Sequence, residues 1–166
     1  MVQNLQKTKE QQLMRAAADF SLKNMNKFFV TLFFLAIVAE SRAQGKIIVT
    51  VTNLVNNNGV CKTCLFTNAS SFAGKGPAFK CAELKIQNKK AVVIFDAVPD
   101  GAYAIAVFHD ENNNNKMDKN FIGIPKEGYG ASKNKLPFAS APTFKENRFE
   151  IKPGSTINIT IRLRNL

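Results

Sequence analysis

Two segments of the chain alternate apolar and polar side chains with a period of two. Residues 46–53 read KIIVTVTN and residues 156–163 read TINITIRL, and most of their apolar residues are β-branched. Successive side chains of a strand point to opposite faces, so this period predicts two half-buried β-strands. The residues expected to face the core are Ile47, Val49 and Val51 in the first strand and Ile157, Ile159, Ile161 and Leu163 in the second.

Five further runs rich in apolar residues predict more strands. They lie at residues 60–67, 81–87, 91–95, 103–108 and 143–151. We expect residues 88–90 and 152–155 to close two hairpins, the second between the last two strands, and Pro-Asp-Gly at 99–101 to form a tight reversal. About seven short strands, with no amphipathic helix after the leader described next, predict an all-β fold, an antiparallel β-sandwich.

The first part of the chain departs from this pattern and predicts a cleavable leader. A short basic start at residues 25–27 (MNK) precedes an uninterrupted, mostly apolar run at 28–39. Ser41 and Ala43 then place small residues three before and one before a cut ahead of Gln44, which is the layout of a secretory signal peptide. The apolar run of about 12 residues is shorter than the roughly 20 that a membrane-spanning helix needs.

We therefore expect residues 1–43 to be a signal peptide, helical before processing, with Met25 as the true start and residues 44–166 as one domain. The mature chain is then secreted or periplasmic and keeps no stable membrane span. The whole chain has a net charge of +11, and 17 Lys and Arg against 9 Asp and Glu leave +8 on the mature domain. Its lysines are scattered, with no basic run interleaved with aromatics, so we expect no nucleic-acid partner.

The most informative polar stretch follows the strand at 103–108. Oxygen-bearing side chains occupy positions one, three, five and nine of a loop, and a backbone carbonyl stands at position seven. In order along the chain, the residues are Asp110, Asn112, Asn114, Lys116 (by its carbonyl) and Asp118. Alternate residues of a curled loop point to its inside, so these oxygens can converge on a hard cation. The spacing therefore predicts a weak Ca²⁺ site, with a Kd of roughly 10⁻⁴ to 10⁻³ M.

Two features depart from an EF-hand loop. Position twelve, where an EF-hand has a bidentate Glu, is Phe121, so Glu127 or Asn120 would have to supply that ligand. Lys116 and Lys119 also add positive charge to the loop. The alternative prediction is an Asn-rich turn whose side chains hydrogen-bond their own backbone.

His109 is the single histidine, and it supports two interpretations. With Asp110 and Glu127 it could centre a small periplasmic hydrolase acting on glycan or peptide, with the three side chains meeting in a concave pocket. Neighbours on a strand point to opposite faces, however, and no activated Ser or Cys nucleophile is evident. We expect a strand-end His that fixes the loop by hydrogen bonds, and no catalytic residues.

The Gly- and Pro-rich segment after the loop offers another kind of site. His109, Glu127 and Tyr129 could form a platform for a sugar or peptide, as in a carbohydrate-binding module. The alternative is that apolar residues pack the long connection onto the sandwich, as in ordered surface loops. These residues are Ile122, Ile124, Tyr129 and Phe138. We expect packing, and the partner stays open between a glycan and a protein at the cell envelope.

Three cysteines bear on the compartment of the protein. Cys61 and Cys64 lie three apart on one predicted strand, at a separation of about 10 Å that is too long to bridge. A cross-strand disulfide from Cys81 to either Cys61 or Cys64 is expected in an oxidising compartment, and it leaves one thiol unpaired.

Two segments resemble known families. VPDGAYAIAVF at residues 98–108 resembles the signature of transthyretin-like (prealbumin-like) and Cna B-type sandwiches, in which the Tyr matching Tyr103 lies on the strand leaving the turn. The block at residues 109–130, with HDENNN, KMD and GIPKEGYG, resembles an uncharacterised family of exported bacterial proteins, domain of unknown function 2141. Members of that family usually have Gly where Asn115 stands, and Asn also tolerates a left-handed bend.

The resemblance covers roughly residues 46–163 and implies an exported prealbumin- or Ig-like sandwich with no established activity. Residue pattern and resemblance together predict an exported, non-enzymatic binding or structural module with a calcium-ordered loop. The hydrolase and the carbohydrate-binding module are the alternatives.

Overall fold

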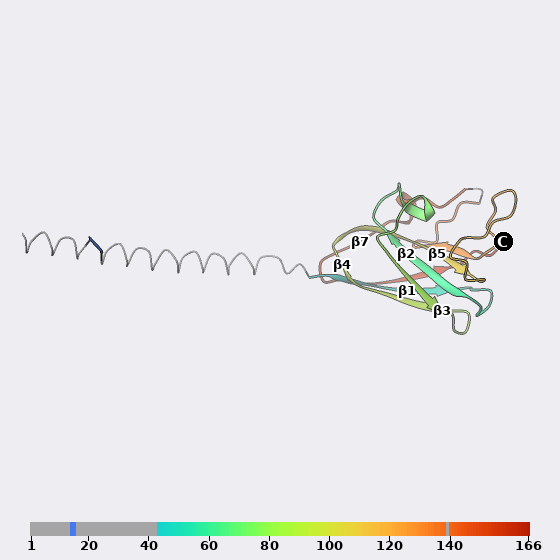
Figure 1. Ribbon diagram of the computed structural model, residues 1–166, viewed down its shortest axis with the longest axis horizontal. Helices are drawn as coiled ribbons and strands as arrows, with labels where there is room; N and C mark the ends of the chain where they lie inside the picture. The colour runs from blue at the N-terminus through green and yellow to red at the C-terminus, as the bar shows by residue number, and fades with distance from the viewer. Residues whose placement is uncertain (1–13, 16–42, 139) are drawn as a thin grey trace, which may run out of the picture. The chain divides into compact units, whose positions relative to one another are not determined.

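The computed structural model describes residues 14–15, 43–138 and 140–166 (Figure 1). The chain divides into two compact units, residues 1–41 and 42–166. Every strand that the structure describes lies in the second unit, so the fold is that of residues 42–166.

The predicted signal peptide falls almost entirely outside the described residues. Its apolar run, its start at Met25 and its cleavage after Ala43 therefore stay predictions. Within the described ranges, no helix combines the length and the apolar character needed to cross a membrane.

One sheet contains the two strands whose alternation is clearest. Its order is β4-β1-β8, with β1 at Gly45–Thr52, β4 at Ala91–Val98 and β8 at Thr156–Arg162. β1 pairs antiparallel with β4 and parallel with β8, where Ile47 lies opposite Ile157. Ile47, Val49 and Val51 are fully buried, so the predicted inward face of β1 is confirmed.

The second sheet is antiparallel throughout and has the order β3-β2-β5-β6, with β7 paired to β5. The bounds are Val60–Phe66 for β2, Lys80–Lys85 for β3, Gly101–Asp110 for β5, Tyr129–Ala131 for β6 and Phe149–Ile151 for β7. A 3-10 turn, η1 (Phe72–Gly74), lies between β2 and β3. The predicted reversal before β5 is present, and the Tyr103 hydroxyl donates to the Pro99 carbonyl across it at 3.1 Å.

The two sheets share one hydrophobic core, so the predicted all-β sandwich is confirmed. Val93 and Phe95 of β4 are buried in the same cluster as Leu65 of β2 and Ile105 of β5. Interdigitation of inner faces from two sheets is what holds a sandwich together. Because the described core and strand pairings all lie within residues 42–166, this unit contains the contacts that stabilise it.

One predicted hairpin has the right turn but the wrong strand partners. Gln87 and Lys90 exchange both backbone hydrogen bonds around a two-residue turn, with Asn88 and Lys89 at positive φ. Beyond this single bridge the strands part, because β3 pairs with β2 and β4 pairs with β1. The predicted pairing of these two strands is therefore wrong. A tight turn reverses the chain locally, whereas the apolar faces of the flanking strands decide which sheet each joins.

The predicted C-terminal hairpin is also wrong. β7 pairs with β5 in one sheet and β8 pairs with β1 in the other, so residues 152–155 carry the chain between the sheets. The strand predicted at 143–151 is shorter because its first half is a helix, α2 (Phe144–Asn147). Thr143 caps this helix by accepting the Glu146 N–H, and T-x-x-E is the capping-box pattern.

Candidate functional site

β5 ends in two buried polar residues that begin the candidate site. His109 and Asp110 are fully buried and lie opposite Cys61 and Val60 of β2. Gly59 approaches so closely that a Cβ there would lie 1.9 Å from the Asp110 carbonyl oxygen, and its φ is 63°. The end of β5 is therefore held by a backbone approach that requires glycine.

The Asp110 carboxylate curls the loop that follows. Its Oδ1 accepts the N–H of Asn114 at 3.0 Å, and its Oδ2 accepts the N–H of Asn115 at 2.8 Å. Asn115 stands at position six of the loop and has a φ of 64°. An EF-hand loop needs a sharp turn at this position and uses Gly for it. The backbone therefore bends where a calcium loop bends.

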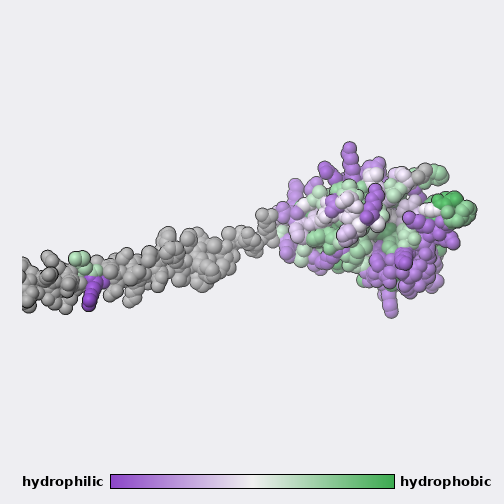
Figure 2. Space-filling view, turned by 45° about the horizontal axis from the view of Figure 1, so that its top comes forward, coloured by the Kyte–Doolittle hydropathy of each residue, from purple (hydrophilic) through white to green (hydrophobic). Residues whose placement is uncertain are grey.

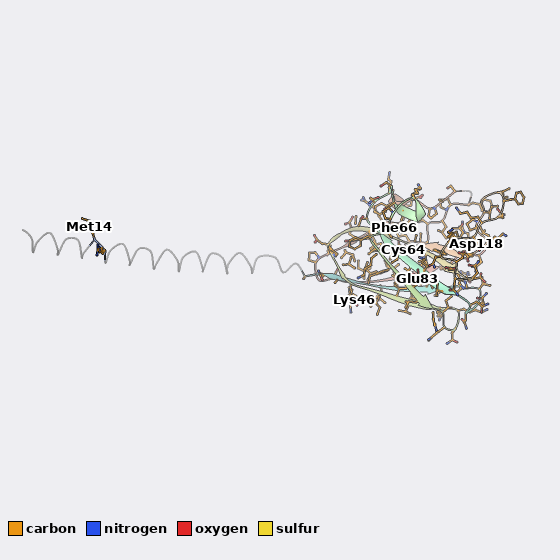
Figure 3. All side chains as sticks on the ribbon, in the orientation of Figure 1. Met14, Lys46, Cys64, Phe66, Glu83 and Asp118 are labelled. Carbon is orange, nitrogen blue, oxygen red and sulfur yellow. A yellow bond between two sulfur atoms is a disulfide. The ribbon has the colours of Figure 1, made fainter. Side chains whose placement is uncertain are left out.

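The side chains at positions three, five and nine converge on one another. One oxygen of Asp118 accepts Nδ2–H of Asn112 at 2.7 Å, and the other accepts Nδ2–H of Asn114 at 3.0 Å. The two Asn oxygens accept the backbone N–H groups of Asn114 and Lys116. The loop thus combines inward-facing polar side chains with an Asn-rich turn. Asp118 lies at the right-hand end of the domain in Figure 3.

Glu127 closes the loop from its far side. It is 5% exposed, and its two oxygens accept the N–H of Glu111 at 3.1 Å and the N–H of Asp118 at 2.9 Å. Phe121, at position twelve, is 98% exposed and supplies no ligand. Of the two residues that the sequence offered for the missing ligand, Glu127 therefore places its carboxylate at the base of the loop.

No ion pair in the described part of the chain neutralises the carboxylates of Asp110, Asp118 or Glu127. Among the described residues, close ion contacts join Lys46 to Asp96, Lys62 to Glu83 and His109 to Glu111. None of these contacts includes Asp110, Asp118 or Glu127. In the same part of the chain, no three His, Cys, Asp or Glu side chains form a metal-ligand group. An ion here would therefore need amide and backbone oxygens as well, and Ca²⁺ accepts such a mixed set.

His109 contacts the turn that precedes β2. Its Nε2 lies 2.8 Å from the Asn58 carbonyl oxygen, and its buried Nδ1 lies 4.0 Å from Glu111 without a hydrogen bond. His109, Asp110 and Glu127 are all buried, and each contacts different backbone groups. A surface hollow of about 420 Å³ is lined by none of these three residues. Its lining residues are Asn53, Asn134, Leu136, Arg162, Leu163, Arg164 and Asn165.

The segment after the loop differs from both expectations for it. His109 and Glu127 are buried, so of the three platform residues only Tyr129, half-buried in β6, reaches the surface. The expected packing of the connection is wrong, because three of its four apolar residues are exposed. The exposed fractions are 63% for Ile122, 41% for Ile124 and 96% for Phe138.

The structure decides which of two cysteines pairs with Cys81. Cys64 of β2 and Cys81 of β3 are directly opposite and form a disulfide, with their Cα atoms 4.1 Å apart. Cys61 is free and fully buried. Burial raises the pKa of the Cys61 thiol from 9.0 to about 11, against a smaller lowering effect of the Thr63 contact. Such a thiol is unreactive at neutral pH.

Comparison with known proteins places the chain in a family. The family model described as "Uncharacterized protein conserved in bacteria (DUF2141)" matches residues 49–159, from β1 into β8, and includes the whole candidate loop. The chain belongs to this family. No curated protein and no solved structure matches it. Membership of the DUF2141 family confirms the resemblance at residues 109–130 and brings no established activity.

Proposed function

We propose that this DUF2141 protein is an exported, non-enzymatic β-sandwich module whose loop at residues 110–127 binds Ca²⁺. The proposal is carried by one observation, the convergence of polar side chains at positions one, three, five and nine around a left-handed bend at position six. Oxygen ligands at alternate positions of such a bend are the basis of calcium loops.

The ligands would be side-chain oxygens of the loop and one carbonyl. They are Asp110, Asn112, Asn114, the Lys116 carbonyl and Asp118, with Glu127 in place of the usual position-twelve ligand. Each carboxylate oxygen of Asp110 and Glu127 accepts one N–H bond and retains a lone pair for an ion. The amide groups that now donate to Asp118 would rotate to present oxygen, so that the cation takes over the neutralising role of their N–H groups.

Isothermal titration of residues 44–166 with calcium tests this function. We expect a saturable heat with a Kd of about 10⁻⁴ to 10⁻³ M, because the set has few carboxylates. Asp118→Asn should remove the heat, since it takes away the carboxylate on which two ligand side chains converge. Glu150→Gln is the matched control, because this exposed acid lies on β7 outside the loop. Absence of heat at millimolar calcium would overturn the calcium proposal.

Export is supported by the leader and by the disulfide. Cys64 and Cys81 are bonded between neighbouring strands, and such bonds persist in oxidising compartments outside the cytoplasm. Mass spectrometry of the protein from fractionated bacterial cells provides the test. We expect a periplasmic or secreted chain that begins at Gln44, whereas an unprocessed cytoplasmic chain contradicts export.

A further inference from the structure

The chain that follows the candidate calcium loop forms a projecting hairpin, which we call the apolar finger (residues 118–126). The Lys126 N–H donates to the Asp118 carbonyl at 2.8 Å, and Lys119 bridges Pro125 in antiparallel fashion. The Asn120 N–H donates to the Ile124 carbonyl at 2.8 Å. The two arms are therefore paired up to the turn at the tip.

The tip of the apolar finger exposes large apolar side chains. Phe121 is 98% exposed, Ile122 is 63% exposed and Ile124 is 41% exposed. Figure 2 shows green apolar surface projecting at the right-hand end of the domain, the end at which Figure 3 places Asp118. Scattered exposed apolar residues are ordinary, but three within four positions on a protruding turn indicate a contact surface.

Three backbone N–H groups of the tip are already hydrogen-bonded within the apolar finger. The Asn120 side-chain oxygen accepts the N–H groups of Ile122 at 3.1 Å and Ile124 at 2.9 Å. The Gly123 N–H donates to the Asn120 carbonyl at 3.0 Å. An unpaired backbone group is costly in a medium without water, so the pairing of these three N–H groups lowers the cost of bringing the tip into an apolar phase.

Positive charge surrounds the exposed apolar tip. Lys119 and Lys126 lie on the two arms and Lys116 lies just before them, and all three are exposed. None of them takes part in the ion pairs of the described residues. Apolar side chains bordered by lysines complement a bilayer surface with anionic headgroups, because the apolar groups enter the acyl boundary while the ammonium groups remain at the phosphates.

We propose that the apolar finger docks this protein on a lipid bilayer that contains anionic phospholipid. Phe121 and Ile122 insert below the headgroups, and Lys119 and Lys126 contact lipid phosphate. A bilayer is favoured over a protein groove because the surface is a projecting apolar tip with three internally bonded N–H groups and with exposed lysines on both arms. Docking goes beyond the calcium proposal and does not depend on it, although the Asp118 backbone N–H donates to the Glu127 carboxylate at the base of the finger.

The chain contains no Trp, which allows a direct test. Phe121→Trp in residues 44–166 places a single tryptophan at the tip. Val92→Trp places one at a 54% exposed position on β4 and is the matched control. With phosphatidylcholine vesicles that contain phosphatidylglycerol, we expect a blue shift for Phe121→Trp and none for Val92→Trp. Equal shifts, or no shift for either variant at low salt, overturn the proposal.

Vesicle co-sedimentation then measures the contribution of each part. Phe121→Ser should weaken binding by at least about tenfold, because it removes the largest inserted side chain. Lys119→Gln and Lys126→Gln should each weaken it by about fivefold and reduce its salt dependence. Val92→Ser is the control, and circular dichroism checks the fold of each variant. Docking is contradicted if Phe121→Ser binds vesicles as well as the native chain does. It is also contradicted if the substitution abolishes self-association of the protein and leaves vesicle binding unchanged.

The same co-sedimentation is run in calcium and in EDTA. Binding that persists in EDTA supports docking by the tip itself. Failure of the calcium titration with intact vesicle binding counts against the calcium proposal alone, and failure of vesicle binding with an intact calcium heat counts against docking alone.

Discussion

The buried polar groups at the centres of two long loops make four hydrogen bonds each but differ in charge. In residues 111–128, the carboxylates of Asp110 and Glu127 accept four backbone N–H bonds. In residues 132–148, the single buried amide of Asn147 accepts two backbone N–H bonds and donates two to carbonyls. One loop is therefore centred on acidic groups and the other on a neutral group.

The two centres differ in what it costs to bury them. A neutral amide satisfies donors and acceptors together, and it carries no charge to desolvate. Buried carboxylates are costly unless paired, and Asp110 and Glu127 have no cationic partner among the described residues. The second loop shows that order can be achieved in this fold without acid. The acid in the first loop therefore favours a cation.

Substituting an acid for the central amide of one loop, and an amide for a central acid of the other, gives the largest expected change in the free energy of unfolding. Asn147→Asp replaces the amide that donates to the carbonyls of Lys135 and Thr143 with a carboxylate facing them. We expect a loss of about 3 to 5 kcal/mol in the free energy of unfolding, the cost of a buried unpaired charge. Asp110→Asn should cost about 1 to 2 kcal/mol, because one backbone N–H loses its acceptor.

Urea denaturation at neutral pH without calcium measures both variants. A much larger loss for Asn147→Asp than for Asp110→Asn supports the comparison. Equal losses would mean that the two centres have the same tolerance for charge, and the acidic loop would then give no reason to expect a cation.

The stability of the domain at alkaline pH tests the buried Cys61 thiol, which lies next to the start of the acidic loop. Cys61 lies opposite His109, and burial raises the pKa of its thiol from 9.0 to about 11. Between these values the unfolded chain has lost the proton that the folded chain keeps, so stability is complete below pH 9.0 and is lost as pH rises toward 11. The loss from this group should reach roughly 2 to 3 kcal/mol.

Denaturation curves from pH 8 to 11 should be compared between the native chain and Cys61→Ala. Burial also raises the pKa of Tyr103, with a smaller contribution from Asp100, and this group destabilises both chains in the same direction. The difference between the two slopes therefore isolates Cys61. Parallel slopes would show that the thiol does not keep its proton in the folded state.

Seven of the eight described strands were predictable from the sequence, but the three-residue β6 and the strand partners were not. The alternation in β1 and β8 reports which side chains face a core, and both inner faces were placed correctly. The parallel pairing of β1 with β8 joins opposite ends of the domain, and no local pattern encodes such a long-range contact. The α2 helix was missed although Thr143 and Glu146 form a capping box, because a four-residue helix has no periodicity to detect.

The candidate site was predictable to a similar extent. Spacing alone placed Asp110 and Asp118 on one curled loop, because alternation of side-chain direction is a local property. The exposed tip was not foreseen, since apolar residues such as Ile122 are normally expected to pack inward. Asn120 explains the difference, because its side chain bonds the tip backbone and so lets the hairpin project without core contacts.

The smallest expected effect compares one left-handed Asn in each loop. Asn115 has a φ of 64°, and its side-chain oxygen accepts a bond from half-buried Lys62. Asn134 has a φ of 56°, and its amide bonds the Thr160 carbonyl and the Arg162 N–H of β8. Asn115→Gly should change stability by no more than about 0.5 kcal/mol, because Gly adopts this backbone freely, and this offsets the loss of one exposed side-chain bond.

Asn134→Gly should instead cost about 1 to 2 kcal/mol, because it relieves the same backbone strain but removes two bonds to the sheet. Thermal unfolding of both variants without calcium checks the difference. If the two substitutions cost the same, the side chain of Asn134 does not anchor its loop. If Asn115→Gly also leaves the calcium heat intact, position six serves the candidate site through its backbone bend, as the geometry of the loop requires.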